Sequence, residues 1–151
     1  MAADGVDATL ANLFSPKLEN IEILQSLGNN AGYGRIFDVE EKTLENLAAL
    51  VKKEINSDKV TIYGEKTKKI KRVATFCGGG FEGEYFDKFN ADLIVSSDIK
   101  HHLIADGMER GLSILNISHY GAENYSFKKI SRDTKEILKI DSIYFEDNIL
   151  L

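Results

Sequence analysis

In the second half of the chain, short apolar runs alternate with stretches in which apolar residues recur at helical spacing. The runs 73–76, 93–95 and 114–117 have the length and composition of buried strands. Residues 99–108 and about 121–138 show the helical pattern, and each is predicted to form a helix. Strands that alternate with helices predict an α/β fold with a mixed, largely parallel sheet flanked by helices.

Three details of this half are also predicted from the pattern. A helix should follow the glycines after the first run and extend from Phe81 to Phe89. Residues 140–145 should form a last strand. The apolar residues of the helix at 121–138 should face the core; they are Phe127, Ile130, Ile137 and Leu138.

The first half of the chain predicts two helices and a hairpin. A short helix is expected within residues 1–14. Residues 21–39 alternate in strand fashion around a turn at 28–32, which is typical of a hairpin with a long turn. Residues 43–55 form the clearest helical pattern, and 60–62 indicate a short strand.

Composition narrows the class of protein. The chain has 151 residues, which suits one α/β unit over residues 1–151. Its formal net charge is −5, whereas nucleic-acid-binding domains are usually basic, so no nucleic-acid partner is expected. No apolar run approaches the roughly 20 residues of a membrane span. Cys77 is the only cysteine, which excludes an internal disulfide and indicates a cytoplasmic protein.

Candidate chemistry gathers where the predicted strands end. The clusters are Cys77–Gly80, Ser96–His102 and Ser118–Glu123. Open α/β sheets bind their ligands beyond the carboxyl ends of the strands. The three clusters together therefore indicate one functional edge of the sheet.

His119 and Glu123 are the most specific pair in these clusters. They lie four residues apart, so they share one face if a helix begins at the end of the strand. Imidazole and carboxylate groups are good ligands for zinc or iron. Spacing alone leaves open whether they bind a metal or are a helix-start histidine with a carboxylate neighbour.

The other two clusters each have two interpretations. Gly78, Gly79 and Gly80 would allow close approach of the backbone to a ligand, or simply form a tight turn. No Gly-Lys-Ser/Thr follows them, so they are not a Walker loop. The adjacent His101 and His102 cannot face the same way on a helix, and His102 is the candidate for a site.

Four segments together resemble one protein family. They are Gly34–Ile36, Val73–Gly80, Ala91–His102 and Asn116–Glu123. In this order and spacing they are similar to blocks of the Nif-three-like family (NGG-interacting factor three), often labelled GTP cyclohydrolase 1 type 2 homologues. The resemblance covers nearly all of this chain, but only the C-terminal part of a family member.

The resemblance implies a two-domain α/β fold, usually a ring-shaped hexamer, with a site for two divalent ions such as zinc, iron or manganese. Its ligands are an early His-His pair, a mid-chain Asp and a late His-x-x-x-Glu. His119 and Glu123 match the late motif. Residues 78–80 resemble a loop near the metal cleft, and His102 matches a histidine that many members carry there.

The chain departs from the family pattern in its first part. The early His-His block is absent, because the His-His dipeptide at 101–102 belongs to another motif. Met1 occupies the position of the mid-chain Asp, and Asp4 and Asp7 lie at the wrong offset. The resemblance thus implies an N-terminally shortened member that keeps two of five ligands and binds metal weakly alone.

Two functions follow as alternatives. One is metal-dependent, hydrolase-like chemistry that requires an N-terminal complementing chain or a longer chain, with His102 as the candidate acid or base. The other is a non-enzymatic, oligomerising interaction module. Both readings expect a homo-oligomer.

Overall fold

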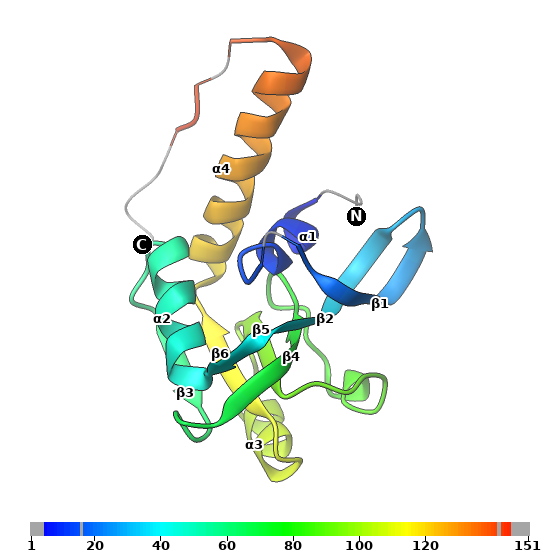
Figure 1. The fold of residues 1–151 in the computed structure, drawn as a ribbon, viewed down its shortest axis with the longest axis vertical. Coiled ribbons are helices and arrows are strands. Elements are labelled where there is room, and N and C mark those ends of the chain that lie inside the picture. Colours follow the sequence, from blue (N-terminus) through cyan, green and yellow to red (C-terminus); the bar gives the residue numbers. More distant parts are fainter. Residues whose placement is uncertain (1–4, 16, 142, 146–151) are drawn as a thin grey trace.

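A six-stranded mixed sheet organises the fold (Figure 1). The structure is a computed structural model and describes residues 5–15, 17–141 and 143–145. The strands, in sheet order, are β1 (Glu19–Gly28), β2 (Ala31–Thr43), β4 (Lys69–Thr75), β5 (Leu93–Ser97), β6 (Ser113–Ile117) and β3 (Val60–Tyr63). The helices are α1 (Val6–Ala11), α2 (Leu44–Glu54), α3 (His101–Glu109) and α4 (His119–Leu138).

Parallel pairing is confined to the centre of the sheet. Strands β4, β5 and β6 are parallel, whereas β1, β2 and β3 pair antiparallel with their neighbours. The α/β class and the mixed sheet flanked by helices are confirmed. The parallel part is smaller than predicted, because the β1–β2, β2–β4 and β3–β6 pairs are all antiparallel.

The central strands are apolar on both faces because helices cover both. Leu93 and Val95 of β5 pack in a cluster with residues of α1, α2 and the start of α4. Ile94 of the same strand packs on the opposite side with Leu103 and Ile104 of α3. All three β5 side chains are fully buried, as expected for parallel strands between two helical layers.

The hairpin of β1 and β2 is tighter than predicted. Gly28 pairs with Ala31, so only Asn29 and Asn30 form the turn. Both asparagines have positive φ, of 49° and 58°. This backbone conformation suits a two-residue hairpin turn, and asparagine tolerates it better than most residues. The remaining residues of the predicted turn belong to the strands.

The helix predicted at 81–89 is wrong. The structure has only a 3-10 turn, η1 (Gly83–Tyr85), in this segment. Its aromatic rings pack on Phe76 instead, with ring centroids 5.0 Å away for Phe81 and 5.8 Å for Phe89. Burial of these rings outweighs the helical spacing of the sequence.

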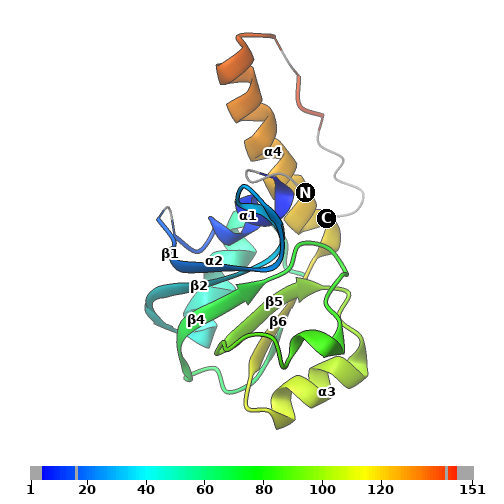
Figure 2. The same cartoon turned by 90° about the vertical axis from the view of Figure 1, so that its right-hand side faces the viewer.

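Helix α4 forms where it was predicted, but its inward face was assigned wrongly. Only its first turns pack on the body, where Ala122 and Ser126 are fully buried. The rest projects beyond the sheet (Figure 2), so that Phe127, Ile137 and Leu138 are 53%, 76% and 59% exposed.

The strand predicted at 140–145 is also wrong, because its described residues adopt no regular structure. Residue 142 lies outside the described residues. No helix among the described residues is both long and apolar enough to cross a membrane.

Candidate metal centre

His119 is the first residue of α4 and directly follows the end of β6. Ser118 caps the helix, since its hydroxyl accepts a hydrogen bond of 3.0 Å from the amide of Gly121. The cap fixes the start of the helix, so Glu123 lies one turn further on the same face. The predicted proximity is present: His119 Nε2 and Glu123 Oε1 are 3.1 Å apart.

The separation of these two atoms fits two ligands of one ion. With bonds of about 2.1 Å, two ligands lie roughly 3.0–3.4 Å apart for angles between a right angle and the tetrahedral value. Both side chains are half-exposed, so the position between them is open to solvent. Imidazole nitrogen and carboxylate oxygen suit zinc, iron or manganese.

Asp98 binds the other nitrogen of the same ring. Its Oδ2 lies 2.5 Å from His119 Nδ1. Asp98 follows β5 directly and has a φ of 51°, in the left-handed region. The sequence analysis included Asp98 only as part of the cluster Ser96–His102, and its contact with His119 was missed. The available signal was its position after a predicted strand, in one of the three clusters expected at the same edge of the sheet.

The glycine loop packs against this pair. A Cβ atom on Gly78 would lie 3.6 Å from His119 Nε2, and one on Gly79 would lie 3.3 Å from Asp98 Cβ. Gly78 has a φ of +81°, which favours glycine. Gly80 instead faces the Tyr33 hydroxyl, which a Cβ would approach to 2.6 Å. The first two glycines thus border the His119 site, and the third borders the hairpin.

A shallow depression of about 460 Å³ lies beside the site. Its wall is largely polar and comes from β3, the end of β6 and the start of α4. The polar residues that line it are Lys59, Thr61, Asp98, Asn116, Ser118 and His119.

The two carboxylates change the ionisation of the imidazole between them. The hydrogen bond that the ring donates to Asp98, followed by the nearby charge of Glu123, raises the pKa of His119 against the opposing effect of desolvation. The pKa of the neighbouring thiol is also raised, because burial and the charges of Asp7 and Glu123 raise the pKa of Cys77 to about 12. Cys77 is therefore a protonated thiol at neutral pH, and a weak nucleophile and metal ligand.

His102 does not join this cluster. It lies in the first turn of α3 with an exposed side chain, as does His101. It makes no hydrogen bond or ion pair with the residues that the structure describes. Its assignment as a candidate acid or base stays a prediction.

Asp7 is buried and makes contacts that stabilise the fold. Its carboxylate is 3.2 Å from Arg35 Nη1 and accepts a hydrogen bond of 3.2 Å from the Cys77 amide. Burial outweighs these contacts and raises the pKa of Asp7 to about 6. Its partners explain its presence without a metal. Asp4 and Met1 lie outside the described residues.

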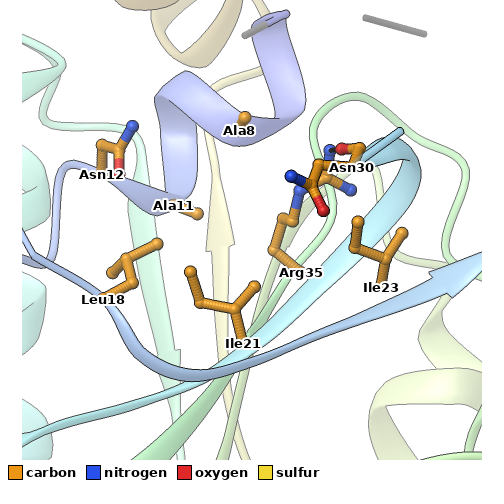
Figure 3. Close-up of a pocket in the computed structure, with 8 residues that line it drawn as sticks. All are labelled: Ala8, Ala11, Asn12, Leu18, Ile21, Ile23, Asn30 and Arg35. Atoms are coloured by element: carbon orange, nitrogen blue, oxygen red, sulfur yellow. Dashed lines mark hydrogen bonds between the residues drawn. The ribbon is translucent and has the colours of Figure 1, made fainter. Parts of the chain in front are cut away.

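A second pocket, of about 290 Å³, lies between α1 and the hairpin (Figure 3). Its apolar wall is formed by Ala8, Ala11, Leu18, Ile21 and Ile23. Arg35 reaches its polar side with a charge already paired to Asp7. This pocket shares no lining residue with the depression beside His119.

The described part of the chain supplies an incomplete ligand set. Within residues 5–15, 17–141 and 143–145, no three His, Cys, Asp or Glu side chains are arranged to hold one metal ion. Asp98 is on the far side of the ring from Glu123, so the two carboxylates cannot both bind an ion at Nε2. The geometry places two potential ligands, His119 Nε2 and Glu123 Oε1, side by side, with the Asp98 carboxylate on the opposite ring nitrogen.

One protein family model matches almost the whole chain. The family model described as Duf34/NIF3 (NGG1p interacting factor 3) matches residues 1–148. The chain belongs to this family. The resemblance noted in the sequence is thereby confirmed.

Relatives within the Duf34/NIF3 family are longer than this chain. A Staphylococcus aureus (strain MRSA252) protein named GTP cyclohydrolase 1 type 2 homolog is 37% identical over 108 residues, which cover 70% of this chain and 29% of that protein. A Clostridium perfringens protein of the same name is 30% identical over 91% of this chain and 53% of its own length. The chain thus spans about half or less of these relatives.

The fold is shared as well. The crystal structure of a Staphylococcus aureus hypothetical protein has a TM-score of 0.73 and 26% identity to this Duf34/NIF3 chain. The similarity covers 92% of this chain and 59% of that protein.

Proposed function

We propose that this chain contributes His119 and Glu123 to a divalent metal site for zinc, iron or manganese. The observation that carries the proposal is the 3.1 Å separation between His119 Nε2 and Glu123 Oε1, with Asp98 on the opposite nitrogen. Metal-binding histidines usually donate their second ring N–H to a carboxylate or carbonyl group. The arrangement supports a metal role over a chance contact at a helix start.

The remaining ligands would come from other residues of a longer family protein or from an N-terminal complementing chain. Two protein ligands leave most of a coordination shell to water, so this chain alone should bind metal weakly. The resemblance implies a two-ion site in complete members. Complementation is therefore part of the proposal.

We further propose hydrolase-like chemistry for the completed site, as the name of the relatives suggests. A bound divalent ion would supply Lewis-acid activation of water. Residues Gly78 and Gly79 would form one wall, and their missing side chains leave room beside His119 and Asp98. His102 remains the candidate acid or base from the resemblance.

Metal titration of the purified chain tests this function. Calorimetric titration with zinc should give weak binding that His119→Ala abolishes and Glu123→Gln weakens. His101→Ala is the matched control, because His101 is exposed on a different helix. Binding that survives unchanged in His119→Ala would contradict the proposal. Addition of an N-terminal fragment of a family relative with the His-His block should tighten binding.

A homo-oligomerising interaction module is the second candidate function. It is favoured by the projecting half of α4, where Phe127, Ile137 and Leu138 are exposed. A second copy of the chain would cover these side chains. Light scattering should then show an oligomer that Phe127→Ser together with Ile137→Ser reduces to a monomer, whereas Lys135→Ser should not. A monomeric wild-type chain would exclude this function.

A further inference from the structure

Two carboxylates compete for the single proton of a neutral His119 ring. Asp98 Oδ2 lies 2.5 Å from Nδ1, and Glu123 Oε1 lies 3.1 Å from Nε2. A neutral imidazole carries its proton on only one nitrogen, so only one of these contacts can be a hydrogen bond donated by the ring. Which one it is decides which nitrogen keeps a lone pair.

The geometry points to Asp98 as a positioning residue that holds the proton of neutral His119 on Nδ1 and leaves the Nε2 lone pair directed toward Glu123. This inference rests on the proposed metal function, because the free lone pair on Nε2 would be the one that binds the ion. The Nδ1 contact is the shorter of the two, and charge-assisted hydrogen bonds to carboxylates are among the strongest in proteins. Asp98 itself would not bind the ion.

The backbone around Asp98 fixes the carboxylate in this place. Asp98 follows β5, and its neighbour Ser97 pairs with Ile117, two residues before His119. The parallel pairing of β5 and β6 therefore sets the distance between the two side chains. Gly79 packs on the other side of Asp98, since an added Cβ would lie 3.3 Å from Asp98 Cβ. Asp98 has one side-chain torsion fewer than Glu123, so it loses less freedom in a fixed contact.

The Nε2 side is arranged differently. Glu123 is on the same helix as His119 and is half-exposed. A Cβ on Gly78 would only reach ordinary contact with Nε2, at 3.6 Å, so the backbone leaves this nitrogen accessible. The two nitrogens thus have distinct surroundings: a short, supported contact at Nδ1 and an open position at Nε2. A supporting carboxylate of this kind typically changes metal affinity by 10–100-fold.

Nitrogen-15 NMR of the metal-free chain tests the tautomer without any metal. The chain has only three histidines, so the His119 ring is assigned by its loss in His119→Ala. At a pH well above the imidazole pKa, wild-type His119 should carry its proton on Nδ1. Asp98→Ala should shift the population toward Nε2–H, and Asp98→Asn, whose amide oxygen can still accept, should retain part of the preference. Equal or dominant Nε2–H in the wild type would overturn the inference.

Metal titration supplies the second readout. Asp98→Ala should weaken zinc binding by about 10–100-fold, with Asp98→Asn between it and the wild type. Asp92→Asn is unsuitable as a control, because Asp92 accepts hydrogen bonds from the amides of Lys71 and Arg72. Asp106→Asn is a better control, because the Asp106 side chain lies on the solvent-facing side of α3. An unchanged tautomer and unchanged affinity in Asp98→Ala would overturn the assignment. Absence of zinc binding in the wild type would instead contradict the proposed function. The NMR measurement of the tautomer would still test the role of Asp98.

Discussion

Two of the carboxylate contacts with a basic side chain, Asp7 with Arg35 and Asp98 with His119, differ in exposure. Asp7 and Arg35 are only 3% and 4% exposed. Asp98 and His119 are 66% and 41% exposed. The buried pair connects α1, the hairpin and the glycine loop, and it is shielded from exchange with solvent. The exposed pair is in contact with solvent, so it is accessible to a ligand and contributes little to stability.

Removal of Arg35 should have the largest effect on stability. Arg35→Met leaves the Asp7 carboxyl buried without its partner and removes the hydrogen bonds to the carbonyls of Gly32 and Asn30. Breaking a buried pair in this way costs about 3–5 kcal/mol. Urea denaturation at neutral pH measures the loss. The double variant with Asp7→Asn should recover part of it, because no unpaired charge remains; a change below about 1 kcal/mol in Arg35→Met would contradict the structural role.

The next largest effect is the pH dependence that Asp7 imposes. The pKa of Asp7 is raised from 3.8 to about 6, so the folded chain binds its proton more tightly than the unfolded chain. This contribution is fully present below the unfolded pKa and is lost as the pH rises through about 6. The shift corresponds to about 3 kcal/mol. Urea denaturation between pH about 4 and about 7 should show this decline relative to Asp7→Asn; parallel profiles would rule it out.

The exposed pair should give the smallest effect on stability. Asp98→Asn should change the free energy of unfolding by about 1 kcal/mol or less, because exposed ion pairs contribute little. It should nevertheless lower the pKa of His119, since the hydrogen bond to Asp98 is the main cause of its raised value. An NMR titration of the His119 ring measures this pKa. A large loss of stability, with the His119 pKa unchanged, would reverse the comparison between the two pairs.

Sequence pattern predicted local relations better than distant ones. His119 and Glu123 could be paired because they are four residues apart on one helix. Asp98 was missed because its contact depends on the register between β5 and β6, in which Ser97 lies opposite Ile117. The element pattern predicted that both clusters lie at one edge of the sheet, but not which strands pair or which residues align.

Two of the wrong predictions, the inward face of α4 and the helix at 81–89, have a common physical cause. An apolar stripe shows which face of a helix avoids water, but not what covers that face. For α4 the body of the protein ends after the first turns, so Phe127 and Ile137 stay exposed. In the segment 81–89, apolar residues with the same kind of spacing pack their rings around Phe76 instead of forming a helix. Periodicity identifies apolar side chains, and tertiary structure decides their partners.

Cys77, whose backbone amide donates a hydrogen bond to Asp7 on α1, can be used for chemical labelling. Its thiol is partly buried and has a pKa of about 12, so reaction with iodoacetamide should be slow in the folded chain. Detachment of α1 would expose the thiol and remove the Asp7 charge near it. The alkylation rate of this single cysteine would therefore report the detachment of α1 from the sheet.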